Sequence, residues 1–314
     1  MRLIFMGSPR FAVPTLEALL AAGHDVALVV SQPDQPAGRG RRLTAPPVAQ
    51  LARSRGLPLL QPATLRDPTV QDALATARPE AIVVAAYGRL LPRAMLALPP
   101  HGCLNVHPSL LPRWRGPAPI QWALLAGDAV TGTSIILLEE RMDAGPILAQ
   151  AELPIGPEDD AVTLETALAE QGAALLVETL PRWAARAIAP RPQDEACATY
   201  TRLLTKADGL LNWTRPAAAL ANQVRACAGW PSAYTFWRGQ QLKVLRAAVL
   251  AERPEVAPGT VWERREERGY GVAVAAGEGS LLLREVALAG RRPVPATAFV
   301  QGYRDFIGSQ LGIS

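Results

Sequence analysis

Short apolar runs alternate with helix-like stretches along the first 190 residues. The run RLIFMG is followed by SPRFAVPTLEALLAAG, in which leucines recur at helical spacing until Gly23. Later runs such as AIVVAA are apolar on both faces, as expected for buried parallel strands. The alternation predicts an α/β fold with a Rossmann-like, mostly parallel sheet. Strands are predicted at 2–7, 25–32, 57–62, 81–88 and 102–107, and helices at 8–23, 45–56, 67–79, 118–128 and 160–187.

The pattern changes in the last third of the chain. Before it, two β-rich runs join across ERMDAG, which places Asp143 and Gly145 at a hairpin-like tip. The stretch IAPRPQDEACATYTRLLTK starts rich in proline and polar residues, which indicates a linker. Short β-like runs with glycine turns follow it and are typical of a small, OB-like β-barrel. We therefore predict a first domain at 1–189, a linker at 190–206 and a C-terminal barrel at 207–314.

The net charge of +4 is unevenly distributed. Residues 207–314 contain thirteen Lys and Arg against nine Asp and Glu, so they account for the whole excess. A second basic segment, 34–55, has five arginines and a single acidic residue. Two separate basic surfaces suggest a large polyanionic partner. From charge alone, a solvated arginine-rich surface is the slightly better explanation.

Composition argues against several classes of protein. The first apolar run is interrupted by Gly7, Pro9 and Pro14, and no later run has membrane-spanning length, so we expect a soluble, cytoplasmic protein. Three widely spaced cysteines fit free thiols in a reducing compartment. Three histidines without a CxxC or HxxxH motif argue against a metal site.

Two polar side chains end the predicted strand at 102–107. Asn105 and His107 are two residues apart, so both leave the same face of a strand. An imidazole beside a carboxamide can stabilise an oxygen that gains negative charge, which acyl transfer requires. Asp143, from another loop, is the candidate acid that orients the imidazole. Taken singly, a structural histidine and a turn-forming aspartate are better explanations, but the rigid SLLPRWRG loop beside them favours a site.

The stretch around these residues resembles a known family. NVHPSLLPRWRGPAPIQWALLAGD, with MDAGPIL after it, is similar to the catalytic core of enzymes that use 10-formyltetrahydrofolate as formyl donor. The resemblance covers nearly the whole chain and, through VVSQPDQPAGRGRRLTAPPVAQLA and YTRLLTKADGLLNW, extends to the methionyl-tRNA formyltransferases. It implies formyl transfer from 10-formyltetrahydrofolate to the α-amine of methionine on initiator tRNA, for translation initiation. Folate is then a co-substrate, no covalent enzyme intermediate is needed, and we expect a monomer.

The resemblance also implies roles for individual residues. The catalytic trio is expected to be Asn105, His107 and Asp143. The folate is expected to contact Ser109, Leu110, Leu111 and Pro112, with Tyr87, Gly88, Arg89 and the loop 141–145 as walls. The inserted DQPAGRGRRL loop is expected to contact the tRNA acceptor end through Arg39, Arg41 and Arg42. One departure is Pro108, where the family often has glycine; its fixed φ and missing N–H stiffen the turn.

Three alternatives remain open at this point. The same core could act on a small amine, such as glycinamide ribonucleotide or a nucleotide-linked amino sugar, and the GRGRR loop is the better discriminator for the latter. A nicotinamide-dependent dehydrogenase is opposed by the missing G-x-G-x-x-G motif after the first strand. An RNA-binding protein with a barrel module explains the charge but leaves Asn105, His107 and Asp143 without a role.

Overall fold

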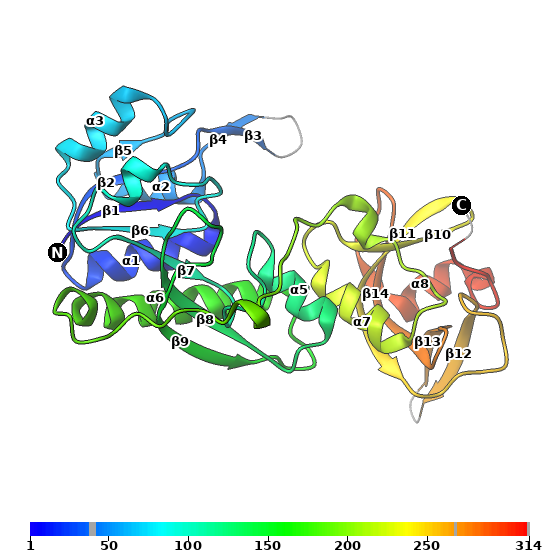
Figure 1. Cartoon of the computed structure of the whole chain (residues 1–314). Coiled ribbons are helices and arrows are strands. Elements are labelled where there is room, and N and C mark those ends of the chain that lie inside the picture. Colours follow the sequence, from blue (N-terminus) through cyan, green and yellow to red (C-terminus); the bar gives the residue numbers. More distant parts are fainter. Residues whose placement is uncertain (38–41, 267–268, 313–314) are drawn as a thin grey trace. The chain divides into compact units, whose positions relative to one another are not determined.

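The computed structural model (Figure 1) describes residues 1–37, 42–266 and 269–312. The chain forms two compact units. The first comprises Met1–Pro119, Val130–Ile155 and Glu165–Arg202, and the second comprises Ile120–Ala129, Gly156–Leu164 and Leu203–Ser314. Residues 190–202, predicted as part of the linker, therefore belong to the first unit. The functional boundaries at 189 and 206 stay predictions.

A seven-stranded sheet forms the centre of the first unit, with the order β5-β2-β1-β6-β7-β8-β9. Its first five members are parallel, while β8 runs antiparallel to β7 and β9 antiparallel to β8. The strands are β1 (Arg2–Gly7), β2 (Asp25–Val30), β5 (Leu59–Leu60), β6 (Ala81–Ala85), β7 (Cys103–His107), β8 (Val130–Leu137) and β9 (Ile147–Pro154). The predicted Rossmann-like, mostly parallel sheet is confirmed.

Helices cover both faces of this sheet (Figure 1): α6 packs against Val106 of β7, and α3 contributes Val70 and Leu74 to the cluster on the opposite face. Proline stands in the first turn of α1, α2 and α3, where its fixed φ suits the helix and no N–H is needed. The predicted helix at 8–23 begins only at Val13, because Arg10–Ala12 forms a 3₁₀ turn. The helices are α1 (Val13–Ala21), α2 (Pro47–Ser54), α3 (Pro68–Thr76), α4 (Arg93–Leu96), α5 (Pro119–Ala126) and α6 (Ala161–Ala184).

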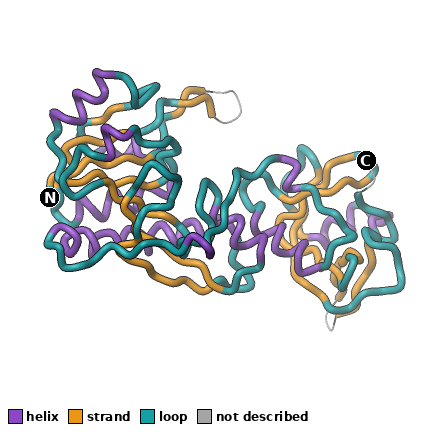
Figure 2. Tube along the Cα trace, viewed as in Figure 1, coloured by secondary structure: helices purple, strands orange, loops and turns teal. Residues whose placement is uncertain are grey.

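The arginine-bearing insertion after β2 forms a hairpin rather than an irregular loop. Its strands β3 (Gln35–Ala37) and β4 (Arg42–Thr44) pair antiparallel and make a separate two-stranded sheet. Figure 2 shows this hairpin as a short arm that leaves the main sheet. The predicted tRNA contacts Arg39 and Arg41 lie outside the described residues, and only the backbone of Arg42 is described.

Successive side chains of β7 point to opposite faces of the sheet. Cys103 belongs to a buried cluster with Val84 of β6 and Met95 of α4. Val106 lies on the other face, against Gly172 of α6. The alternation therefore places Asn105 and His107 on the same face as Cys103, away from α6.

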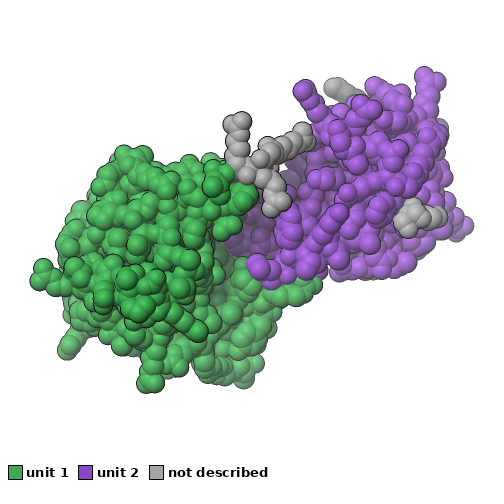
Figure 3. All heavy atoms as spheres, turned by 90° about the horizontal axis from the view of Figure 1, so that it is seen from above, with its two compact units in different colours: residues 1–119, 130–155, 165–202 green, residues 120–129, 156–164, 203–314 purple. Residues whose placement is uncertain are grey.

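The second unit, purple in Figure 3, contains an antiparallel sheet with the order β10-β11-β14-β13-β12. A cluster of edge-to-face aromatic rings lies against it, in which Trp237 contacts Phe299, Tyr303 and Phe306. The predicted β-rich C-terminal domain is confirmed as an antiparallel sheet, while its closure into an OB-like barrel stays a prediction. Its elements are α7 (Ala217–Ala226), β10 (Ala233–Trp237), β11 (Gln240–Leu250), β12 (Val261–Glu266), β13 (Gly269–Ala275), β14 (Ser280–Leu288), β15 (Val294–Pro295) and α8 (Ala296–Gly302).

Two further sequence-based expectations concern cysteines and membranes. All three cysteines are free: Cys103 and Cys227 are buried, and Cys197 is exposed. None of the helices in the described ranges combines the length and apolar character that a bilayer crossing requires.

The contact between α6 and β7 can be tested by substitution. A Cβ atom at Gly172 would lie 2.5 Å from Val106 Cγ1 and 3.0 Å from Thr133 Cγ2. We expect Gly172→Ala to lower the free energy of unfolding by about 1–3 kcal/mol through overpacking, although alanine gains about 1 kcal/mol of helix propensity. Val106→Ala should offset part of this cost in a double-mutant cycle measured by urea unfolding. A single variant as stable as wild type would contradict the close packing.

Candidate active site

Strand β7 delivers two polar side chains to the carboxyl edge of the parallel strands. Asn105 pairs with Val84 of β6 on one side and with Ile136 of β8 on the other, and His107 pairs with Ser134. Both side chains are nearly removed from water, with exposed fractions of 9% for Asn105 and 4% for His107. Within the described chain, the Asn105 carboxamide forms no hydrogen bond. The residue is nearly buried, but its amide oxygen and nitrogen are not among the buried polar atoms that lack a partner, so they still face solvent and are open to a ligand.

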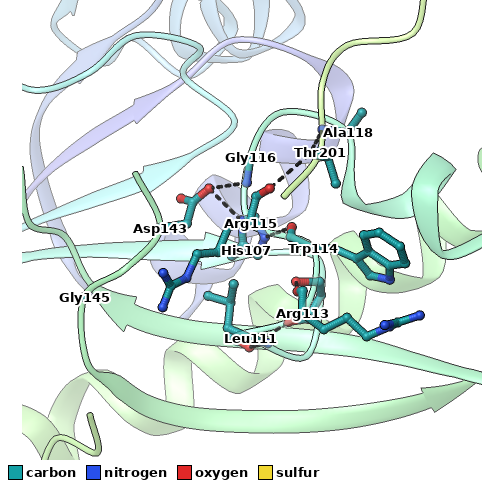
Figure 4. Close-up of polar contacts among 12 residues, drawn as sticks. His107, Leu111, Arg113, Trp114, Arg115, Gly116, Ala118, Asp143, Gly145 and Thr201 are labelled. Carbon is teal, nitrogen blue, oxygen red and sulfur yellow. Dashed lines mark hydrogen bonds and ion pairs between the residues drawn. The ribbon is translucent and has the colours of Figure 1, made fainter. Parts of the chain in front are cut away.

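The ring of His107 lies between a backbone carbonyl and the Asp143 carboxylate (Figure 4). Its Nε2 is 3.1 Å from the Trp114 carbonyl oxygen, and because a carbonyl only accepts, Nε2 carries the hydrogen. Its Nδ1 is 3.7 Å from Asp143 Oδ2, which is longer than a hydrogen bond. The same Oδ2 accepts a 2.8 Å hydrogen bond from the backbone N–H of Gly116. The structure thus brings the predicted histidine and aspartate together, with Nδ1 as the nitrogen that faces the acid.

The turn from Ser109 to Pro112 is held by its own hydrogen bonds and by β8. The Ser109 hydroxyl donates to the Arg113 carbonyl at 2.6 Å. The Ser134 hydroxyl donates to the Ser109 carbonyl at 2.6 Å and accepts from the Leu111 N–H at 3.1 Å. Leu110 and Leu111 also line a cavity of about 560 Å³ with β9 residues, and this cavity does not include Asn105 or His107. The role of this turn in folate binding stays a prediction.

The segment after β6 is less exposed than its predicted role as a folate wall suggests. Tyr87 is 2% exposed and belongs to the cluster that contains Cys103. Its hydroxyl has no hydrogen-bond partner in the part of the chain that the structure describes, and burial raises its pKa, partly opposed by Arg89. The Arg89 guanidinium donates to the carbonyls of Pro62 and Ala63, and Gly88 has φ +81°.

Residues 1–37, 42–266 and 269–312 contain no cluster of three or more His, Cys, Asp or Glu side chains that could hold a metal ion.

Comparisons with known proteins agree on one family. The formyl transferase family matches residues 1–180, and the formyl transferase C-terminal domain matches residues 203–304. A methionyl-tRNA formyltransferase of Chloroflexus aurantiacus is 52% identical over 302 residues, which covers 96% of this chain and 97% of its own. The enzyme of the same name from Geobacter sulfurreducens is 42% identical over 312 residues, which covers 99% and 97%. The chain belongs to the methionyl-tRNA formyltransferase family.

Solved structures of other proteins share the fold of this chain. An N-formyltransferase from Helicobacter canadensis, in complex with folinic acid and dTDP-3-aminofucose, has a TM-score of 0.66 and 15% identity, covering 90% of this chain and 98% of its own. HypX from Aquifex aeolicus, in complex with tetrahydrofolic acid, has a TM-score of 0.64 and 17% identity, covering 98% and 48%. At these identities the similarity shows the fold alone.

A buried arginine beside the site was missed by sequence reasoning. Arg115 has no exposed surface, and its guanidinium makes a two-pronged ion pair with Glu195 at 2.9 and 3.2 Å. Arg141, from the loop that carries Asp143, donates to the same carboxylate at 2.7 Å. The predicted SLLPRWRG loop contains Arg115, but eighty positions separate it from Glu195. No local pattern in the sequence indicates that Arg115 pairs with Glu195.

The ion pair of Glu195 should make stability depend on pH. Hydrogen bonds from Arg115 and then Arg141 lower the pKa of Glu195 from its usual 4.5 to about 2. A carboxyl with a lowered folded-state pKa stabilises the fold above its unfolded pKa and loses this contribution as pH falls through the folded value. We therefore expect Glu195→Gln to reduce the free energy of unfolding at pH 7, with a difference from wild type that shrinks from about pH 4.5 downwards.

Urea unfolding of both proteins across this pH range checks the expectation. Glu255→Gln is the control, because Glu255 is exposed and makes no ion pair with the described residues. A difference between wild type and Glu195→Gln that stays constant from pH 7 to pH 3 would show that the carboxylate charge is not what stabilises the fold.

Proposed function

We propose that this protein transfers a formyl group from 10-formyltetrahydrofolate to the α-amine of methionine on initiator tRNA. One observation carries the proposal: the Asn105 carboxamide makes no hydrogen bond within the described chain and stays accessible on a nearly buried residue, on the strand that also presents His107. An amide N–H can donate to a developing oxyanion, and an imidazole that faces a carboxylate can accept a proton. Relatives that are 42% and 52% identical over nearly their whole length bear the name methionyl-tRNA formyltransferase, which favours this acceptor over an amino sugar.

The reaction requires one oxygen to be stabilised and one proton to be moved. As the amine attacks the formyl carbon, negative charge develops on the formyl oxygen, and the Asn105 amide donates to it from a site with little water. His107 cannot turn freely, because the Trp114 carbonyl holds its Nε2. Its Nδ1 and the Asp143 carboxylate face each other at 3.7 Å, so this pair is placed to take the proton that the amine releases. The bond from the formyl carbon to the folate nitrogen then breaks, and that nitrogen receives the proton.

The residues present suit a folate co-substrate at the same edge. When bound, 10-formyltetrahydrofolate supplies the activated formyl group on a ring-linked nitrogen. Partly buried leucines Leu91 and Leu138 border the apolar cluster that contains Tyr87, and the Tyr87 hydroxyl is buried without a partner among the described residues. A flat aromatic ring fits such apolar walls. We assign folate binding to residues 87–89 and 109–112.

The large acceptor explains the basic segments that composition alone left open. We assign formyl transfer to residues 1–189 and tRNA binding to residues 207–314, with 190–206 between them, in a monomeric cytoplasmic enzyme. The arginines of the inserted hairpin, residues 39, 41 and 42, are assigned to the acceptor end. Phosphate contacts supply affinity, while the hairpin positions the reacting amine.

The chemistry predicts a large effect on turnover for both polar residues of β7. We expect His107→Ala and Asn105→Ala each to lower kcat by about a hundredfold or more, because they act on charge that appears in the transition state. The KM for folate should stay within about twofold. Steady-state formylation of charged initiator tRNA measures both constants. Cys103→Ala, on the same face of β7, is the control and should retain near-normal kcat; near-normal kcat in the Asn105 or His107 variant would remove that residue from the mechanism.

The hairpin predicts a different kinetic signature. We expect Arg41→Ala/Arg42→Ala to reduce kcat/KM for charged initiator tRNA by about tenfold or more while total tRNA affinity falls less, because the hairpin orients the amine. Formylation kinetics and filter binding separate the two quantities. Arg66→Ala/Arg78→Ala removes the same charge from exposed positions flanking α3 and is the matched control. If both double variants behave alike, the hairpin arginines act only as general positive charge, and a small amine becomes the better acceptor.

A further inference from the structure

The segment 190–202, predicted as part of the linker, forms a strap that contacts the loops of the candidate active site and contains a 3₁₀ turn at Glu195–Cys197. Arg191 exchanges two 2.8 Å backbone hydrogen bonds with Ile147, at the start of β9. Further on, the N–H of Arg115 donates to the Thr199 carbonyl at 2.8 Å, and the N–H of Thr201 donates to the Arg115 carbonyl at 2.7 Å. The strap therefore contacts both the loop after β7 and the end of the loop that carries Asp143.

One side chain of this strap, Gln193, joins the two loops directly. Its Nε2 donates to the carbonyls of Asp143 and Gly145, both at 2.7 Å. Its Oε1 accepts from Arg115 Nε at 3.0 Å and from Arg115 Nη2 at 2.9 Å. Both hydrogens of the amide and its oxygen are thus used, which fixes the orientation of the carboxamide.

The loop at 143–145, which Gln193 holds, has little conformational freedom of its own. Asp143 adopts a left-handed conformation with φ +49°, which costs energy for a residue with a side chain. Gly145 approaches β8 so closely that a Cβ atom would lie 1.8 Å from the Leu137 carbonyl oxygen. Because the carbonyls of Asp143 and Gly145 both accept from the Gln193 amide, this amide determines where the Asp143 backbone lies.

The oxygen of the Gln193 amide affects the Asp143 carboxylate indirectly, through Arg115. Arg115 directly precedes Gly116, whose N–H donates to Asp143 Oδ2. Arg115 is fully buried, and in Figure 4 its guanidinium and the Trp114 side chain leave the loop in opposite directions. By holding Arg115, Gln193 also places the donor that sets the distance between Asp143 and His107 Nδ1.

We propose that Gln193 is a positioning residue that holds the Asp143 carboxylate in register with His107. The inference rests on the proposed function, in which Asp143 and His107 act together. Gln193 contacts neither the reacting atoms nor the imidazole; it acts through the backbone of Asp143 and through Arg115. Its removal should therefore reduce turnover without weakening the binding of either substrate.

Two substitutions separate positioning from general stability. Gln193→Leu removes all four hydrogen bonds, whereas Gln193→Glu can still accept from Arg115 but cannot donate to the carbonyls of Asp143 and Gly145. We expect both variants to lose about ten- to a hundredfold in kcat, with KM values for folate and charged tRNA within about twofold of wild type. Gln193→Glu keeps the acceptor for Arg115 and a similar volume, so its melting temperature should fall less than that of Gln193→Leu, and it decides the question if Gln193→Leu does not fold.

The matched control is Gln223→Leu in the second unit. The Gln223 amide donates in the same manner to two backbone carbonyls, those of Asp208 at 2.7 Å and Leu210 at 3.0 Å, and it is 5% exposed. Its replacement should lower the melting temperature and leave kcat within about twofold of wild type. If it lowers kcat as much as the Gln193 variants do, loss of a buried glutamine explains the effect and the positioning role is wrong.

A double variant shows whether Gln193 acts through Asp143. If it does, Gln193→Glu/Asp143→Asn should have the kcat of Asp143→Asn alone, within about twofold. Losses that multiply would overturn the inference. If Asp143→Asn itself turns over normally, the proposed role of Asp143 fails and the inference fails with it. If Asp143→Asn is impaired while both Gln193 variants turn over normally, only the inference about Gln193 is wrong.

Discussion

A guanidinium that has lost all contact with water must be fully paired, and Arg115 imposes this requirement on the loops of the N-terminal unit. Its side-chain partners, Gln193, Glu195 and the Tyr200 hydroxyl, come from a segment about eighty residues later in the chain. Glu195 also receives Arg141 from the loop that carries Asp143. Three segments that are distant in sequence are therefore tied to one charge, and removing any one partner would leave the others with unmet hydrogen bonds.

The two polar residues at the end of β7 differ in how their hydrogen bonds are met. His107 is oriented by the Trp114 carbonyl and faces Asp143, so its ring is held ready for proton transfer. Asn105 has no partner within residues 1–37, 42–266 and 269–312, although it is nearly buried. Its amide atoms remain accessible, so a substrate oxygen can supply the acceptor that the chain does not. Low exposure also strengthens any hydrogen bond made to developing charge.

Two residues with a left-handed backbone lie beside the same imidazole. Trp114, whose carbonyl accepts from His107, has φ +63°, and Asp143 has φ +49°. Gly116, whose N–H holds the Asp143 carboxylate, has φ +111°, and a Cβ atom there would lie 2.8 Å from the Thr201 carbonyl. These conformations persist because the strap at 190–202 pairs with the loop on its other side. The site is thus rigid because surrounding segments hold it, rather than because its own sequence prefers that shape.

Local patterns in the sequence were sufficient for the strands, the parallel sheet and the shared face of Asn105 and His107, because side-chain direction in a strand follows from a period of two. The motif around them was sufficient for the family. Local patterns were not sufficient for the start of α1 at Val13 or for the β3–β4 hairpin. They also missed the strap, because its proline-rich composition indicated a linker. Gln193 and Glu195 have no periodicity that marks them. Their partners were decided only when the folded chain enclosed Arg115, because a buried charge pairs with whatever the tertiary structure brings within hydrogen-bond distance, and sequence separation does not enter that energy.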